Sequence, residues 1–102
     1  MANIFKNYTS ASVGTTPVTV YTVPAATTAV IIGCNIANRH TASVDADVQL
    51  SSVYVVKGSP VPEGSALSVL DGKMIAEAGD TIVVTSNTAS GLDVILSVME
   101  QN

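Results

Sequence analysis

The sequence predicts an all-β protein: an antiparallel β-sandwich, jelly-roll or Ig-like, with about eight or nine short strands and no substantial helix. Short segments rich in Val, Ile and Thr are separated by turn residues at intervals of about 8–12 residues, the spacing typical of sandwiches and barrels. Residues 44–50 alternate apolar and polar side chains without a break, as a strand with one buried and one wet face requires. No segment keeps the 3.6-residue period of a helix.

The composition favours one domain with a covered surface. The chain has 102 residues, of which 47% are hydrophobic but only 4% aromatic, so the core must consist mainly of Val, Ile, Leu and Ala. Charged residues make up 12%, about half the usual share. A β-rich chain with so few charges tends to associate through open strand edges. We therefore expect much of its surface to be covered in an assembly.

Charge and cysteine content argue against several classes of function. The net charge is −4, and the four cations are scattered through the chain at Lys6, Arg39, Lys57 and Lys73. Nucleic-acid binding needs clustered cations, so we expect no nucleic-acid partner. Cys34 is the only cysteine, which excludes an internal disulfide and a multi-cysteine zinc site.

Hydropathy gives no membrane signal. No apolar run approaches the roughly 20 residues that span a bilayer, and residues 1–6 lack the apolar region of a signal peptide. We therefore expect no membrane partner and synthesis in the cytoplasm.

Turn residues divide the chain into the expected strands. Residues 4–13 form an N-terminal strand or an arm that becomes a strand by docking, which gives an arm at 1–14 and a sandwich domain at 15–102. Pro24 ends the strand at 18–23, and Gly33 suggests a bulge within the strand at 28–38. The remaining expected strands are 44–50, 52–57, 66–70, 73–77, 81–86 and 92–100, with a loop at 58–64 and a tight hairpin turn at Asp71-Gly72.

The strand patterns also predict which side chains face the core. The residues expected inside are Val30, Ile32, Val48, Leu50, Val94, Leu96 and Val98. Asp45 and Asp47 share the opposite face of their strand and should point to solvent or to a partner.

Residues that perform chemistry are almost absent, so we expect no enzyme, no catalytic residue, no metal ligand and no cofactor. His40 lies alone in a polar turn beside Arg39, without a partner for nucleophilic or metal catalysis. Cys34 lies in an apolar strand with no adjacent cation to lower its pKa. Asp45 and Asp47 lack the loop that a calcium site requires and fit a solvated strand face.

The order of elements resembles a family of small bacteriophage virion structural proteins of the head or tail. The matching segments lie within residues 20–100, a region of about four-fifths of the chain: VYTVPA at 20–25, TAVIIG at 28–33, NIAN at 35–38, VVKGSPVPEGS at 55–65, EAGDTI at 77–82 and LDVILSVME at 92–100. They are mainly turn and strand boundaries. The resemblance implies a non-enzymatic component present in many copies on the virion.

The expected function is capsid decoration: a cement protein that binds the outer shell surface and stabilises the head. Its partners would be the major capsid protein or other virion subunits, and copies of itself, with a trimer suggested by analogy to shell symmetry. Ile4, Phe5 and Tyr8 are the expected partner contacts, because they place exposed apolar groups before the first firm strand. A tail, neck or fibre-base component, or a receptor- or glycan-binding module, remains the alternative.

Overall fold

The computed structural model describes residues 3–70 and 73–102 and confirms the all-β fold class. The described residues form nine strands in two antiparallel sheets and contain no helix. The strands are β1 (Asn3–Val13), β2 (Val18–Thr22), β3 (Thr28–Asn38), β4 (Val44–Leu50), β5 (Val53–Val61), β6 (Ala66–Ser68), β7 (Met74–Ala76), β8 (Thr81–Ser86) and β9 (Leu92–Gln101).

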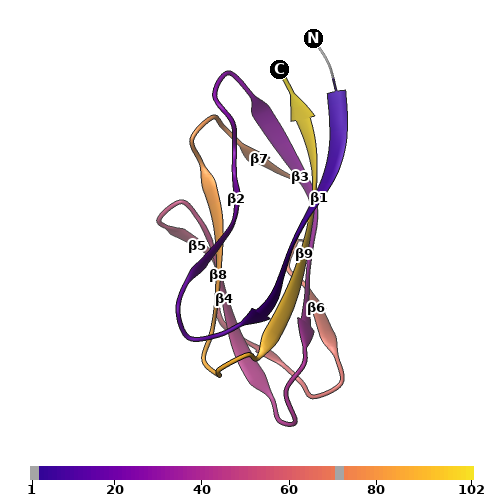
Figure 1. The fold of residues 1–102 in the computed structure, drawn as a ribbon, viewed down its shortest axis with the longest axis vertical. Coiled ribbons are helices and arrows are strands. Elements are labelled where there is room, and N and C mark those ends of the chain that lie inside the picture. The colour runs from indigo at the N-terminus through magenta and orange to yellow at the C-terminus, as the bar shows by residue number, and fades with distance from the viewer. Residues whose placement is uncertain (1–2, 71–72) are drawn as a thin grey trace.

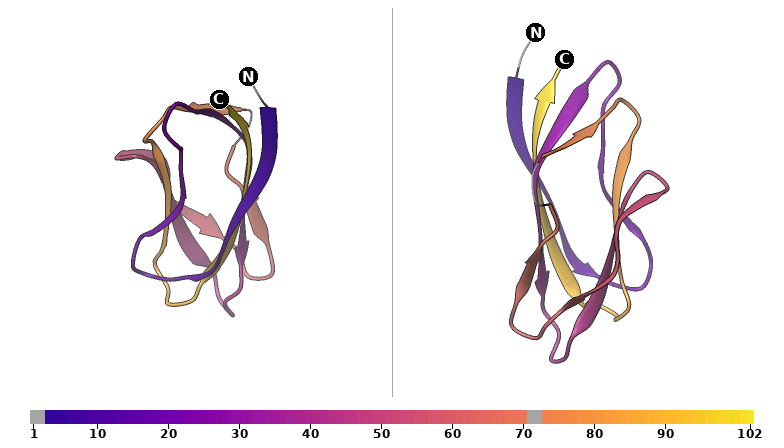
Figure 2. Two further views of the ribbon diagram at one scale, coloured as in Figure 1. Left: turned by 45° about the horizontal axis from the view of Figure 1, so that its top comes forward. Right: turned by 180° about the vertical axis from the view of Figure 1, so that it is seen from behind.

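The two sheets face each other as the layers of a sandwich (Figures 1 and 2). The five-stranded sheet has the order β1-β9-β3-β6, and β7 also pairs with β3. The four-stranded sheet has the order β2-β8-β4-β5. β1 pairs with β9 along its length, so this N-terminal segment is an edge strand of the larger sheet.

The core lies between the sheets and is almost entirely aliphatic. Alternate residues of the long strands point into it, as on β4, where Val44, Ala46 and Val48 are buried. The expected core residues Val94, Leu96 and Val98 are buried in the same way on β9. The other buried apolar residues are Val13, Tyr21, Val23, Ala29, Ile31, Cys34, Ile36, Val61, Ala76, Ile82, Val84 and Leu92.

The expected bulge near Gly33 is present, and it decides which isoleucine is inside. Ile31 pairs with Val98 and Gly33 pairs with Ser97, so Ile32 is an extra residue in β3. Ile31 is fully buried, whereas Ile32 is 40% exposed. The prediction that Ile32 faces inward is therefore wrong, because an apolar run on both faces carries no alternation to show which side is buried.

Two other residues predicted to face the core, Val30 and Leu50, are less buried than predicted. Val30 lies between the buried Ala29 and Ile31 and points to the outer face of the sheet, so its predicted inward orientation is also wrong. Leu50 points inward and packs against the core but is only partly buried, since it lies at the end of β4.

The segments expected to form a hairpin do not pair with each other. Ser68 of β6 pairs with Asn35, and Met74 of β7 pairs with Ile31, so both segments run antiparallel to the same strand, β3. The turn predicted at Asp71-Gly72 lies outside the described residues. The eleven residues of β3 offer room for two short partners in succession, which the local sequence does not reveal.

β5 continues further than the sequence predicts. Residues 58–61, expected in a loop, belong to the strand, and Pro60 pairs with Asp45 of β4. Proline is tolerated there because β5 is an edge strand whose outer side needs no hydrogen-bond donor. Gly58 takes up the irregularity with a positive φ of 62°.

Candidate functional site

An apolar row crosses the outer face of the five-stranded sheet. It consists of Phe5 on β1, Met99 on β9, Val30 on β3 and Ile75 on β7. Each is the direct cross-strand neighbour of the next, because Phe5 pairs with Met99, Met99 with Val30, and Val30 with Ile75. Phe5 is 70% exposed and Ile75 is 55% exposed. The row therefore presents contiguous apolar side chains to the outside.

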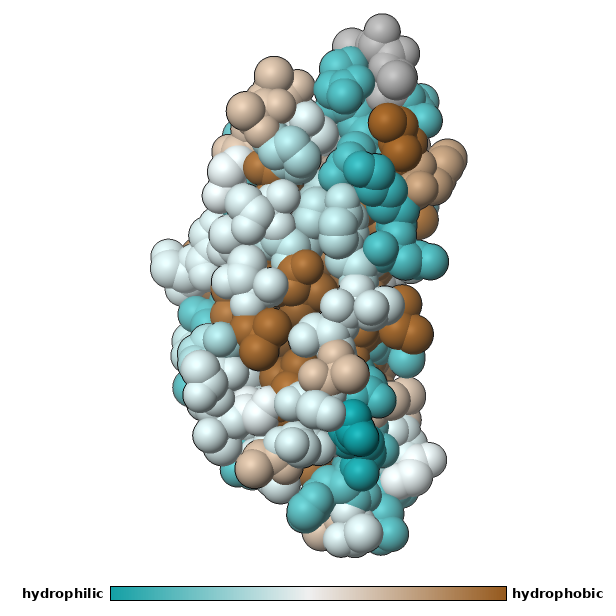
Figure 3. Space-filling view, viewed as in Figure 1, coloured by the Kyte–Doolittle hydropathy of each residue, from teal (hydrophilic) through white to brown (hydrophobic). Residues whose placement is uncertain are grey.

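Two more isoleucines and an open groove extend this surface. The bulged Ile32 and Ile95 of β9 are both exposed. Beside the row lies a groove of about 210 Å³, lined by Phe5, Lys6, Asn7, Ile32, Ser97 and Val98. Figure 3 shows hydrophobic atoms, in brown, reaching the surface along the right-hand margin, where the five-stranded sheet lies.

This outer face carries almost no charge. Among the outward-pointing residues of the described strands in this sheet, only Asp93 is ionisable, and it lies near one end of β9. The Arg39 guanidinium neutralises it, with 3.1 Å between Nη1 and Asp93 Oδ1. The same arginine contacts the hydroxyl of Ser12, and the Ser12 N–H donates to Asp93 at 2.9 Å. The charge is thus confined to a bonded cluster away from the apolar row.

The outer face of the four-stranded sheet is mainly polar, and the two acids of its strands outnumber their one outward cation, Lys57 of β5, whose Nζ lies 4.6 Å from the centre of the Tyr54 ring. Asp45 and Asp47 of β4 alternate with buried residues and point outward, as the sequence pattern predicts. The Asp47 carboxylate accepts a hydrogen bond from the N–H of Gly58 at 2.6 Å. The exposed apolar residues of this sheet, Val53 and Tyr54, lie on its edge strand β5. The other outward positions on β2, β4 and β8 are Thr19, Thr22, Gln49, Thr81, Val83 and Thr85.

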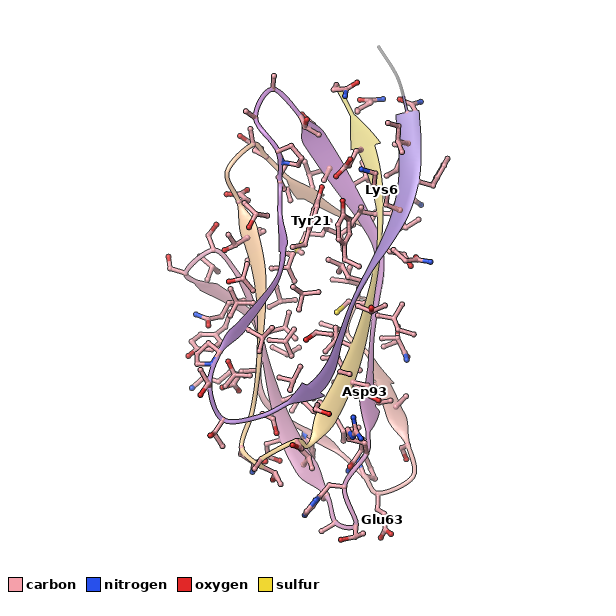
Figure 4. The ribbon with its side chains drawn as sticks, viewed as in Figure 1. Lys6, Tyr21, Glu63 and Asp93 are labelled. Atoms are coloured by element: carbon pink, nitrogen blue, oxygen red, sulfur yellow. The ribbon has the colours of Figure 1, made fainter. Side chains whose placement is uncertain are left out.

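A buried carboxylate, Glu100, joins the two sheets. It is only 5% exposed. Its Oε2 accepts hydrogen bonds from the hydroxyls of Tyr21 at 2.6 Å and Tyr8 at 3.2 Å, and Lys6 Nζ lies 3.3 Å from Oε1. Figure 4 shows the Lys6 and Tyr21 side chains converging on the space between β1 and β2. The tyrosine rings lie against each other with 4.5 Å between their centroids.

The bonds in this cluster account for its electrostatics. The Tyr21 hydrogen bond, followed by Lys6, lowers the pKa of Glu100 below its ordinary value, although burial acts in the opposite direction. Burial and the bond to Glu100 raise the pKa of Tyr21. The hydrogen bond to Glu100 raises the pKa of Lys6. At neutral pH the cluster therefore holds an ionised Glu100, a cationic Lys6 and a neutral Tyr21.

Sequence reasoning missed this cluster, although one signal was present. Glu100 continues the inward-facing series Val94, Leu96 and Val98 of β9. A charged residue at an inward position requires bonded partners, because burying an unpaired charge is costly. Its partners come from β1 and β2, which lie far from it in the sequence, and so the partners themselves could not be read from the local pattern.

The residues considered for chemistry lie apart. His40 is exposed, and its backbone N–H donates to Asn38 Oδ1 at 2.7 Å. Cys34 is buried, and burial raises its pKa to about 11, which keeps the thiol protonated and unreactive. Within residues 3–70 and 73–102, no three His, Cys, Asp or Glu side chains are grouped to hold a metal ion.

The three expected partner contacts fall on the two sides of β1. Phe5 points outward in the apolar row, whereas Ile4 and Tyr8 occupy positions whose partners, Glu100 and Leu96, point inward. Ile4 remains 40% exposed, and Tyr8 packs against Tyr21. The structure thus does not bring these three side chains together, and it adds Met99, Val30 and Ile75 to the surface around Phe5.

Comparisons with known proteins relate the chain to others by fold. No family model and no curated protein matches it. In the part of the chain that the structure describes, no helix is long and apolar enough to cross a membrane. A solved chain from the work "Bacillus endospore appendages form a novel family of disulfide-linked pili" is similar, with 14% sequence identity and a TM-score of 0.59. The match covers 98% of this chain and 88% of that one, and at this identity it shows a shared fold.

Proposed function

We propose that this chain is a non-enzymatic structural protein of a bacteriophage virion, and that it decorates and cements the outer surface of the capsid. The observation that carries the proposal is the contrast between its two outer faces. One presents an uncharged apolar row, and the other presents the carboxylates Asp45 and Asp47. The choice of a bacteriophage virion as the particle rests on the segments that resemble phage virion structural proteins.

The difference between the two faces would orient the subunit on the shell. Burying the apolar row against shell subunits would stabilise the complex by roughly 25 cal/mol for each Å² of apolar surface removed from water. The acidic face would then point to solvent, which keeps the decorated particle soluble. The major capsid protein is therefore the expected partner of the five-stranded sheet, with further copies of this chain beside it.

Cementing follows from linkage. A protein that binds only the assembled shell stabilises it by RT ln(1 + [L]/Kd). Heads stripped of this protein should release DNA at a lower temperature than decorated heads. The protein should also be found on DNA-filled heads that lack tails.

A pair of double variants tests the face. Phe5→Ser with Ile75→Ser removes two exposed apolar groups from the row, and Val53→Ser with Tyr54→Ser removes two from the edge of the other sheet. Only the first pair should abolish loading onto stripped heads, while both fold. Equal loading by the two double variants would contradict the proposed docking face.

A tail, neck or fibre-base component is the second candidate, and the likeness to a pilus chain favours it. Those pili are disulfide-linked, whereas Cys34, the one cysteine of this chain, is buried. Absence of the protein from tail-less heads, together with its presence on tails, would favour this candidate. Stripped virions that keep robust heads but no longer attach to cells, or glycan binding by the isolated protein, would favour a receptor-binding module.

A further inference from the structure

The sheet edges of the sandwich are unequally protected against pairing with another chain. The edge formed by β6 and β7 consists of two segments of three residues each. β5 contains Pro60 and the positive-φ Gly58, and its register with β4 shifts twice. β2 has five residues and a register shift after Thr19. Short, irregular and proline-containing edges are the usual devices against edge-to-edge association.

β1 lacks these devices over its first eight residues. From Asn3 to Ser10 it pairs with β9 without a register shift, so its other side offers a regular series of backbone donors and acceptors. Every residue from Asn3 to Asn7 is exposed. Figures 1 and 2 show this half of β1 along the margin of the molecule, away from β2.

The charge of β1 permits self-pairing. The chain has a net charge of −4, but β1 contains no acid, and its single cation, Lys6, is bonded to Glu100 of the same molecule. Two copies can therefore approach along this edge without bringing unpaired like charges together, provided that their lysines do not face each other.

We propose that β1 pairs antiparallel with β1 of a second copy, which joins two five-stranded sheets across a two-fold axis at Asn7. The proposal rests on the homo-oligomer part of the proposed function and names its contact. Residues opposite each other in an antiparallel pair share a face. The two apolar rows therefore lie on the same side of the joined sheet, available to one shell surface, only when odd-numbered residues oppose odd-numbered ones.

Overlap and charge select the register. Within the regular segment, two registers of this kind overlap over about seven residues each, one centred on Lys6 and one on Asn7. The first sets two lysines directly opposite each other, which is destabilising. The second sets Asn7 against Asn7 and Phe5 against Thr9 of the partner strand. The register centred on Asn7 is therefore favoured.

A charge-swap experiment tests the pairing on the isolated protein. Asn7→Lys puts two lysines on the axis and should raise the dimer Kd by more than about tenfold. Asn3→Lys makes the same change on the same face of β1 but outside the overlap, and should leave the Kd unchanged. Mixing the Asn7→Lys and Asn7→Asp proteins should restore a heterodimer. Sedimentation from about 1 μM to 1 mM, the range of small interfaces, measures the masses.

A cysteine variant tests the register independently. Directly opposite Cβ atoms lie about 5 Å apart, so Asn7→Cys should form an interchain disulfide on mild oxidation. In Thr9→Cys the two thiols would lie roughly 14 Å apart along the strands, and this variant should not cross-link. The native Cys34 is buried and should not contribute.

The outcomes separate this proposal from the docking of the apolar face. A monomer over the whole concentration range, a trimer, or a dimer insensitive to Asn7→Lys would overturn the β1 contact without bearing on whether the protein loads onto heads. Cross-linking of Phe5→Cys in place of Asn7→Cys would overturn the register. Failure to load onto heads by a protein that dimerises as described would count against the virion role alone.

Discussion

The outer face of the five-stranded sheet and the outer face of the four-stranded sheet cover the same aliphatic core from opposite sides, yet they differ in chemistry. The first presents Phe5 and Ile75 with almost no charge, whereas the second presents Asp45, Asp47 and threonines. Folding constrains the inner positions of both sheets equally. This difference is the basis of the proposal that the first face docks on another protein surface while the second meets water.

The largest effect is expected at the bulge that separates inner from outer residues on β3. Ile31→Asp would bury an unpaired charge and should cost more than about 4 kcal/mol, enough to prevent soluble expression. Ile32→Asp should cost about 1 kcal/mol or less, because this neighbour is on the outer face. The soluble yield of the two variants, and thermal melting of whatever is recovered, measure the difference, with Leu96→Asp as a buried reference. Similar behaviour of Ile31→Asp and Ile32→Asp would mean that the bulge does not place Ile31 on the inner face and Ile32 on the outer face.

A smaller effect is expected where Glu100 links the sheets. Tyr21→Phe deletes the 2.6 Å hydrogen bond to its carboxylate and should cost about 1.5 to 3 kcal/mol at pH 7. Tyr54→Phe, on an exposed tyrosine of the other sheet, should change little. Urea denaturation at pH 7 compares the two variants.

The same variant should alter the dependence of stability on pH. Because the folded-state pKa of Glu100 is lowered, its contribution is complete above the ordinary value of 4.5 and is lost as the pH falls through the lowered pKa. Tyr21→Phe removes the largest cause of that lowering. The stability difference between wild type and variant should therefore narrow between pH 7 and pH 3. A difference that widens on acidification would mean that Glu100 is not ionised in the native protein.

A change in stability of about 1 kcal/mol is expected on the inner side of the five-stranded sheet. Cys34→Ala should cost about this much through lost packing and leave assembly intact. His40→Ala, in an exposed turn, should leave both stability and assembly unchanged. Loss of particle assembly by either variant while the fold is kept, as seen by circular dichroism, would argue for a chemical role.

The smallest effect is expected on the acidic face. Asp45→Asn and Asp47→Asn should each change the free energy of unfolding by less than about 0.5 kcal/mol, because both side chains point outward and an amide oxygen at position 47 can still accept the hydrogen bond from Gly58. Denaturant titration measures this. A larger change would show that the acidic face supports the fold and is not merely solvated.

Most strands could be predicted from the sequence because their information is local. The alternation of β4 and the turn residues around β2 and β8 lie within a few residues of the structure they determine. Even the bulge at Gly33 had a local signal, a glycine inside an apolar strand.

The orientation of β3 and the Glu100 cluster were not predictable in the same way. Ala29 to Ile32 are all apolar, so a shift of one residue leaves the pattern unchanged while exchanging the two faces. The partners of Glu100 lie on β1 and β2, and only the tertiary fold brings them to β9. The apolar row was likewise hidden, since its four members come from four strands.

The unequal protection of the sheet edges sets a valence: the number of neighbours that one molecule can bind by pairing strands along the hydrogen-bonding direction. A subunit with two open edges can add copies indefinitely and grow a ribbon, whereas a subunit with one open edge closes after a single partner. With only β1 regular and unblocked among the described edge strands, strand addition stops at a pair. Any growth beyond the pair would then proceed through side-chain contacts on the faces, and on the proposed capsid the spacing of the shell subunits would determine how many copies gather.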